Sequence, residues 1–162
     1  MKLFASLFSK IRTRRYEVEL FNERTFYKEF VKDLRHCKSE VIIESPFLTA
    51  RRINALLPEL RLLVCRDVRI IINTRDPREH DAYMKSEAEY ALNQLHELGI
   101  TILYTGGLHR KLAIIDCKIL WEGSLNILSQ NNSCEIMQRT ESEDHVRRVI
   151  NFTGLSKFLS KL

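Results

Sequence analysis

Residues 109–116, HRKLAIID, are the most informative stretch of this sequence. The apolar run from Leu112 to Ile115 is short and bounded by polar residues and turn glycines, which predicts a β-strand. Strand side chains alternate between two faces, so His109 and Lys111 should point the same way and Asp116 the opposite way. We therefore expect Asp116 to support the fold behind this strand and not to touch the histidine.

His109 and Lys111, on one face of a strand end, suit a phosphate group. An imidazole can attack phosphorus or transfer a proton, and an ammonium group neutralises the negative charge that develops on phosphate oxygens. Ser124 and Asn126 are also two residues apart and can offer a hydroxyl and an amide to the same oxygens. The pattern predicts a site for phosphoryl chemistry.

These residues resemble the motif of the phospholipase D superfamily, in which His-x-Lys is followed after four residues by Asp and then by Gly-Ser-x-Asn. The match is complete at the following positions: His109, Lys111, Asp116, Gly123, Ser124 and Asn126. The resemblance extends forward to Glu135, where many members have an acidic residue that orients the histidine. It extends back to residues 41–47, VIIESPF, which look like the strand and Ser-Pro-aromatic turn found early in such domains.

The resemblance implies a phosphodiesterase that needs no metal and no cofactor. In the mechanism it implies, His109 attacks a phosphodiester and forms a phosphohistidine, which water then hydrolyses. Lys111, Ser124 and Asn126 would hold the phosphate oxygens in place of a metal ion. Glu135 would hydrogen-bond the second imidazole nitrogen and so fix the tautomer of the ring.

The sequence contains a single copy of the motif, which bears on the assembly of the site. Members with two copies place them face to face, and single-copy members resemble half of that arrangement and form homodimers. The resemblance therefore implies a homodimer with two His109 and two Lys111 side chains in one cleft, the second His109 protonating the leaving oxygen. We expect Asp116 and Gly123 to support the motif structurally.

Size and charge favour a nuclease within this superfamily. The chain has 162 residues, a formal charge of +5 and a pI near 9.1, which favours an anionic partner. Small single-motif members are commonly endonucleases. Residues 121–129, WEGSLNILS, are similar to the domain attached to DNA helicases and to bacterial defence or repair enzymes. This similarity implies DNA, single strands included, as the substrate, and a helicase, repair or defence protein as a partner.

Several residues outside the motif are candidates for substrate binding. The specific candidates are Ser45, Phe47, Arg110 and Arg139. Arginines that can contact phosphates along a groove are Arg51, Arg52, Arg75, Arg78, Arg110, Arg139, Arg147 and Arg148. The alternative for each arginine is an ordinary solvated charge.

Two alternatives from other functional classes stay open. Residues 1–15 combine apolar side chains at helical spacing with basic ones, which suits a lipid phosphodiesterase at a membrane surface. We favour the simpler interpretation, in which this segment packs on its own domain or on a partner. The second alternative is a nucleic-acid-binding module that keeps the fold without turnover.

Residues 16–162 are expected to form one α/β domain, with a mixed β-sheet sandwiched between helices. Strands are predicted at 16–21, 41–44, 68–73, 100–104, 112–115, 119–123 and 135–139, and helices at 25–37, 49–64, 81–98 and from 142 onward. Asn22 or Thr25 should open the first helix, and Pro58 is a point at which the second could break or restart. The four cysteines show no metal-site spacing, which favours reduced thiols in the cytoplasm.

Overall fold

The computed structural model describes residues 17–129 and 132–158. The predicted segment 1–15 lies outside the described residues. The strands are β1 (Val18–Asn22), β2 (Glu40–Glu44), β3 (Arg69–Thr74), β4 (Thr101–Tyr104), β5 (Leu112–Ile115), β6 (Ile119–Gly123) and β7 (Ile136–Glu141). The helices are α1 (Phe26–His36), α2 (Ala50–Val64), α3 (Ala82–Glu97) and α4 (Glu143–Thr153), with short 3-10 helices η1 (Pro77–Glu79) and η2 (Leu155–Phe158).

The strands form one seven-stranded sheet in the order β1-β7-β6-β5-β2-β3-β4. β2, β3 and β4 are parallel to each other, and all other neighbours are antiparallel. The predicted mixed sheet is therefore confirmed. This topology brings the ends of β2, β3 and β6 and the beginnings of β5 and β7 to the same edge of the sheet.

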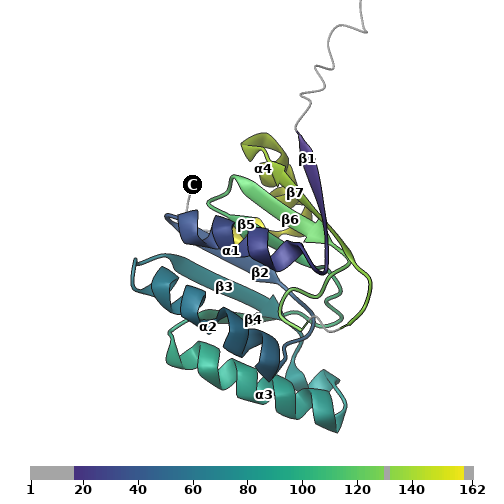
Figure 1. Ribbon diagram of the computed structural model, residues 1–162. Helices are drawn as coiled ribbons and strands as arrows, with labels where there is room; N and C mark the ends of the chain where they lie inside the picture. The colour runs from purple at the N-terminus through teal and green to yellow at the C-terminus, as the bar shows by residue number, and fades with distance from the viewer. Residues whose placement is uncertain (1–16, 130–131, 159–162) are drawn as a thin grey trace, which may run out of the picture.

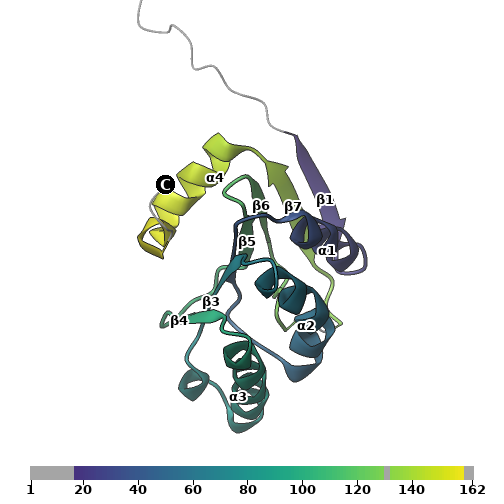
Figure 2. The same cartoon turned by 90° about the vertical axis from the view of Figure 1, so that its left-hand side faces the viewer.

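Helices cover both faces of the sheet, as predicted (Figures 1 and 2). On one face, α1, α2 and α3 pack over a core in which Trp121 lies against the rings of Phe26 and Phe30. On the other face, Val146 and Ile150 of α4 pack on apolar residues of the central strands. Each strand of the centre is apolar on both sides because both faces are buried.

The predicted helices agree with the structure except at one point. Thr49 caps α2 by accepting a hydrogen bond from the backbone N–H of Arg52, at 3.4 Å. The expected break at Pro58 was wrong, because α2 continues through this residue. Both Pro58 and Asn54, whose carbonyl loses its helical N–H partner at the proline, are exposed, so water can satisfy that carbonyl.

Candidate active site

His109 and Lys111 lie together at the edge of the sheet where β5 begins. Lys111 Nζ is 2.9 Å from His109 Nδ1 and donates to the carbonyl oxygen of His109 at 2.8 Å. The two side chains therefore share a face, as the alternation of an extended chain requires. His109 is exposed and Lys111 is partly buried, so both groups are within reach of a ligand in solution.

Ser124, directly after β6, and Glu135, directly before β7, contact each other at the same edge. The hydroxyl of Ser124 donates to Glu135 Oε2 and accepts from the backbone N–H of Ile136 at 3.1 Å. Ser133 donates to the other carboxylate oxygen of Glu135, Oε1, at 2.6 Å. Within the chain, Glu135 is therefore held by two serines, and no described carboxylate contacts the imidazole of His109.

Gly123 stands where β6 passes close to β7. A Cβ atom at this position would overlap the carbonyl oxygen of Ile136 and approach Met137 Cα to 2.9 Å. A larger residue would push β7 away, and with it the turn that carries Ser124 and Glu135. The close approach of the two strands explains why glycine is needed here.

Asn126 turns its amide oxygen inward. Asn126 Oδ1 is buried and has no hydrogen-bond partner among the described residues. A buried oxygen without a partner costs free energy, and a role in binding or catalysis is one reason for a fold to retain such an atom. The carbonyl oxygen of Asn126 meanwhile accepts from Ser129 N at 3.1 Å, which closes the turn after the motif.

Asp116 lies at the opposite end of β5 from His109. Its carboxylate accepts hydrogen bonds from the backbone N–H groups of Lys38, Ser39 and Glu40 at 2.8–3.1 Å, and also from the Ser39 hydroxyl and the Cys37 thiol. Burial acts to raise the pKa of Asp116, but these hydrogen bonds outweigh it and lower the pKa to about 2. Asp116 is therefore ionised and tied to the start of β2.

Three neighbouring influences act on the pKa of Lys111 in opposing directions. Burial lowers the pKa of Lys111, the carboxylate of Glu135 acts to raise it, and the guanidinium of Arg75 lowers it further. Glu135 and Arg75 are thus near enough to Lys111 to act on its charge. The structure brings together Lys111, His109, Ser124 and Glu135 as predicted candidates, with Arg75 beside them.

Ser45 and Phe47 occupy the loop after β2, at the same edge. The hydroxyl of Ser45 donates to the carbonyl of Phe47 at 3.1 Å and accepts from the backbone N–H of Leu128 at 3.2 Å. Ser45 therefore joins this loop to the turn after the motif. The centre of the Phe47 ring is 5.1 Å from that of the His80 ring and 5.4 Å from the guanidinium carbon of Arg75.

The side chain of Arg110 points away from those of His109 and Lys111, toward Glu44 on the opposite face of the sheet. It forms an ion pair with Glu44 through Nε at 2.5 Å and a second contact at 2.7 Å. The Glu44 side chain is 0% exposed and also accepts from Asn73 Nδ2 at 2.7 Å. The sequence analysis did not identify Glu44 and Asn73 as partners of Arg110. The signal that could have identified Glu44 is a carboxylate at the end of an apolar strand.

The structure does not bring Arg139 to the motif. It forms an ion pair with Asp33 of α1 at 2.8 Å and with Glu19 of β1 at 3.0 Å. Asp33 also accepts from the indole N–H of Trp121 at 2.8 Å. Arg139 therefore belongs to a network that ties α1 to the sheet.

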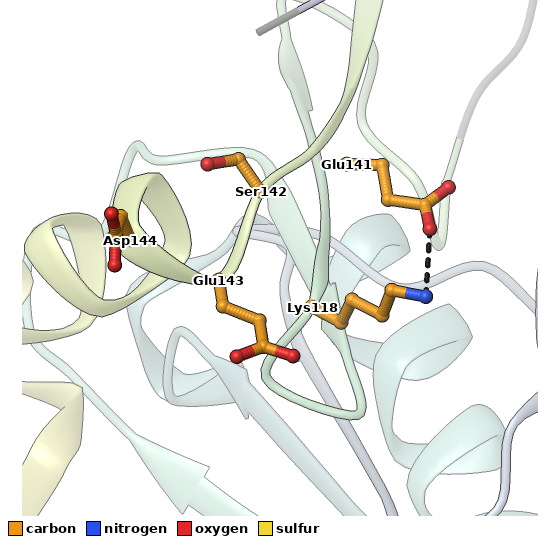
Figure 3. A pocket seen from close by; sticks show the side chains of 5 residues that line it. All are labelled: Lys118, Glu141, Ser142, Glu143 and Asp144. Atoms are coloured by element: carbon orange, nitrogen blue, oxygen red, sulfur yellow. Dashed lines mark ion pairs between the residues drawn. The ribbon is translucent and has the colours of Figure 1, made fainter. Parts of the chain in front are cut away.

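A shallow pocket lies at the other edge of the sheet, where β7 meets α4 (Figure 3). Its lining comprises Lys118, Glu141, Ser142, Glu143 and Asp144. The lysine pairs with Glu141 at 2.8 Å, so the lining carries more negative than positive charge. Such a pocket does not suit a phosphodiester. In residues 17–129 and 132–158, no group of three or more His, Cys or carboxylate side chains is placed to hold a metal ion.

Comparison with known proteins places this geometry in a family. Residues 30–153 match the family described as the PLD-like domain of cardiolipin synthase. A separate comparison with curated proteins finds no match. No helix among the described residues has the length and apolar character required to cross a membrane.

Solved structures share the fold. NucT from Helicobacter pylori has a TM-score of 0.68 at 18% identity, covering 85% of this chain and 93% of NucT. Nuc, a phospholipase D family member from Salmonella typhimurium, has a TM-score of 0.67 at 14% identity, covering 85% and 91%. Phosphatidylserine synthase from Haemophilus influenzae has a TM-score of 0.69 at 12% identity, covering 86% of this chain but 38% of the synthase.

Proposed function

The chain belongs to the phospholipase D-like domain family and is a phosphodiesterase of that family, and we propose that it is a metal-independent DNA endonuclease that works as a homodimer. One observation carries the proposal: an exposed His109 and a partly buried Lys111 contact each other at the sheet edge, and the sequence contains a single copy of the full motif. In-line displacement at phosphorus needs a group on each side of the phosphate, one to attack and one to protonate the leaving oxygen.

The contact between Lys111 and His109 bears on the tautomer of the imidazole. An ammonium group donates, so Nδ1 of His109 accepts in this geometry and the proton of the neutral ring resides on Nε2. Attack by Nε2 requires the proton on Nδ1 instead. We propose that Lys111 turns to the phosphate when substrate binds, and that Glu135 of the second subunit accepts a hydrogen bond from Nδ1–H, which fixes the tautomer with Nε2 free to attack.

In the proposed reaction, Nε2 of one His109 forms a bond to phosphorus as the bond to the leaving oxygen breaks. The second His109 gives its proton to that oxygen, and a water molecule, deprotonated by the same ring, then hydrolyses the phosphohistidine. Lys111 from both subunits, together with Ser124 and Asn126, would stabilise the negative charge on the phosphate oxygens.

An apolar surface near the motif supports a second copy of the chain as the partner. Val18, Leu20 and Ile136 are 42%, 66% and 55% exposed, and the β1–β7 register places all three on one face of the sheet. Ile136 directly follows Glu135, so this surface begins at the same end of the strands as the site. Clustered exposed apolar residues commonly mark protein interfaces.

DNA is the proposed substrate because the chain is basic and its motif region resembles domains attached to DNA helicases. The proposal includes a helicase, repair or defence protein as a further partner and a cytoplasmic location. The competing function is a lipid phosphodiesterase, favoured by a family description that names a lipid synthase. A nucleic-acid-binding module without turnover is the third possibility.

Cleavage in excess chelator tests the proposal. A plasmid, a single-stranded oligonucleotide and phospholipid vesicles are incubated with native protein and with His109→Ala. We expect native protein to cut DNA, the variant to cut none, and specific activity to fall when native protein is diluted below its dimer dissociation constant. Vesicle hydrolysis without DNA cleavage would favour the lipid function, and DNA binding without cleavage of any substrate would favour the module.

Mixing experiments test the sharing of the site. If each site needs both His109 side chains, a threefold excess of His109→Ala should lower the activity of a fixed amount of native protein to about a quarter after subunit exchange. Activity that is unchanged by the variant, in a protein that exchanges subunits, would contradict the shared site.

A further inference from the structure

Arg75 is a positive charge placed beside the motif by contacts that no family motif describes. It follows β3 directly, at the edge of the sheet where β5 begins. Arg75 Nε donates to the carbonyl oxygen of Leu108 at 2.7 Å, and Leu108 immediately precedes His109. The guanidinium carbon lies 5.4 Å from the centre of the Phe47 ring. These two contacts hold the head group of Arg75 next to His109.

Five of the other seven arginines that the sequence offered for phosphate contacts are placed differently. Three of them pair with carboxylates of the chain: Arg78 with Asp76, Arg110 with Glu44, and Arg139 with Asp33. Arg52 covers the ring of Tyr27, and Arg147 lies near Asp116 at the opposite end of β5. Arg75, in contrast, forms no ion pair with a described carboxylate.

The donors of Arg75 suit an anion. A guanidinium has five N–H groups, and the carbonyl of Leu108 uses the one on Nε, which leaves the four on Nη1 and Nη2. Two adjacent Nη donors can bind two oxygens of one phosphate. Because the head group is already oriented by Leu108 and Phe47, binding would immobilise little additional side chain.

Arg75 and Lys111 are two cations that act on each other at this site. Burial and the guanidinium of Arg75 act to lower the pKa of Lys111, whereas the carboxylate of Glu135 acts to raise it. A single phosphodiester carries one negative charge and is taken up by His109 and Lys111. A second phosphate next to it would neutralise the remaining cation.

We propose that Arg75 binds the phosphate adjacent to the scissile one, so that the site selects a polynucleotide over a substrate with a single phosphodiester, a role that rests on the proposed nuclease function. Nucleic acids repeat phosphates along the chain, whereas a simple phospholipid diester offers one. Arg75 is thus a specificity determinant of the substrate class.

Binding measurements test this role without relying on turnover. A fluorescein-labelled single-stranded oligonucleotide is titrated with His109→Ala protein across a range of salt concentrations, followed by fluorescence anisotropy. Adding Arg75→Gln should weaken binding about tenfold and reduce the slope of log K against log salt by about one phosphate contact. Arg75→Lys should retain the slope. Arg61→Gln, which removes an exposed charge from the distant end of α2, is the matched control and should change neither quantity.

Kinetics separate recognition from positioning. In the native background, Arg75→Gln should lower kcat/KM on the oligonucleotide about tenfold more than on bis(p-nitrophenyl) phosphate, mainly through KM. Equal losses on both substrates would overturn the proposal, because they would show that Arg75 only positions the loop before His109. Unchanged oligonucleotide affinity and salt slope would overturn it as well.

The result for Arg75 is distinguishable from the result for the proposed function. A protein that cuts no DNA but loses oligonucleotide affinity on Arg75→Gln would refute the nuclease function and support the phosphate site. A protein that cuts DNA with the same affinity and salt slope after Arg75→Gln would refute the phosphate site alone. Circular dichroism melts of each variant confirm that the fold is retained.

Discussion

Strand β5 carries motif residues beyond both of its ends, and the two ends are built differently. At the Asp116 end, one carboxylate accepts hydrogen bonds from three backbone N–H groups, a hydroxyl and a thiol. At the His109 end, the only hydrogen-bond partner of the imidazole among the described residues is Lys111. One end of the strand is saturated with hydrogen bonds, and the other leaves donors and acceptors available to a ligand.

The backbone shows the same contrast. Asp116 and Cys117 both have positive φ, 52° and 53°, which gives a tight turn between β5 and β6. Two residues in a left-handed conformation are tolerated because Asp116 gains so many partners across to β2. We infer that the Asp116 end serves stability and the His109 end serves chemistry, and substitutions at each end should separate these roles.

The largest expected effect is on activity, at His109. His109→Ala should lower phosphodiesterase activity by about a thousandfold or more, because it removes both the nucleophile and the proton donor. The free energy of unfolding should stay within about 0.5 kcal/mol of the native value, since the side chain is exposed. Cleavage rates and urea titrations measure the two quantities. A large loss of stability would contradict the division of roles.

At the other end, Asp116→Ala should lower stability by about 3 kcal/mol. The substitution removes the acceptor of three backbone N–H groups and leaves them poorly paired. Asp116→Asn keeps one acceptor oxygen and should cost less. Urea unfolding followed by circular dichroism gives both values. If Asp116→Ala were as stable as the native protein, the carboxylate of Asp116 would not stabilise the turn.

A pH titration sharpens the assignment for Asp116. Its pKa is lowered to about 2 in the folded chain from an unfolded value near 3.8, so ionisation favours the folded state. The stabilisation is fully present above about pH 5 and is lost as pH falls toward 2. The difference in unfolding free energy between native protein and Asp116→Asn should therefore shrink over this range. A difference that stays constant from pH 7 to pH 2 would refute the lowered pKa.

The elements of the fold were predictable because their patterns are local. The predicted strands at 41–44 and 112–115 correspond to the buried strands β2 and β5, and Thr49 and Asp81 cap α2 and α3. The order of strands was not predictable from local pattern. β1 pairs with β7, more than a hundred residues away along the chain, and no feature of residues 18–22 specifies that neighbour.

Within the site, residues adjacent in sequence were predictable and residues from different strands were not. Alternation along an extended chain places His109 beside Lys111, and in the structure Lys111 Nζ lies 2.9 Å from His109 Nδ1. The pair of Arg110 and Glu44 joins β2 to the residue before Lys111, and Arg75 reaches Leu108 from the end of β3. Both contacts depend on strand order, which explains why the sequence singled out Arg110 and Arg139 and not Arg75.

The smallest expected effect concerns Glu44. This buried residue of β2 pairs with Arg110, next to His109, so it should contribute to both stability and activity. Glu44 is buried while Arg110 is 43% exposed, so Glu44→Gln removes a charge from a pair that water reaches on one side only. We expect a loss of about 1–2 kcal/mol in unfolding free energy, less than for a fully buried pair.

Activity should fall together with stability at Glu44, unlike at either end of β5. Arg110 lies between His109 and Lys111 in the sequence, and its ion pair with Glu44 holds its side chain on the opposite face of the strand. Without that ion pair, the backbone at Arg110 is less constrained, and His109 and Lys111 are no longer held on one face. Glu29→Gln, which breaks an exposed pair with Lys32, is the matched control and should change neither quantity measurably. If Glu44→Gln lowered stability with no change in kcat, the ion pair would serve the core alone and the opening of β5 would be positioned by its backbone.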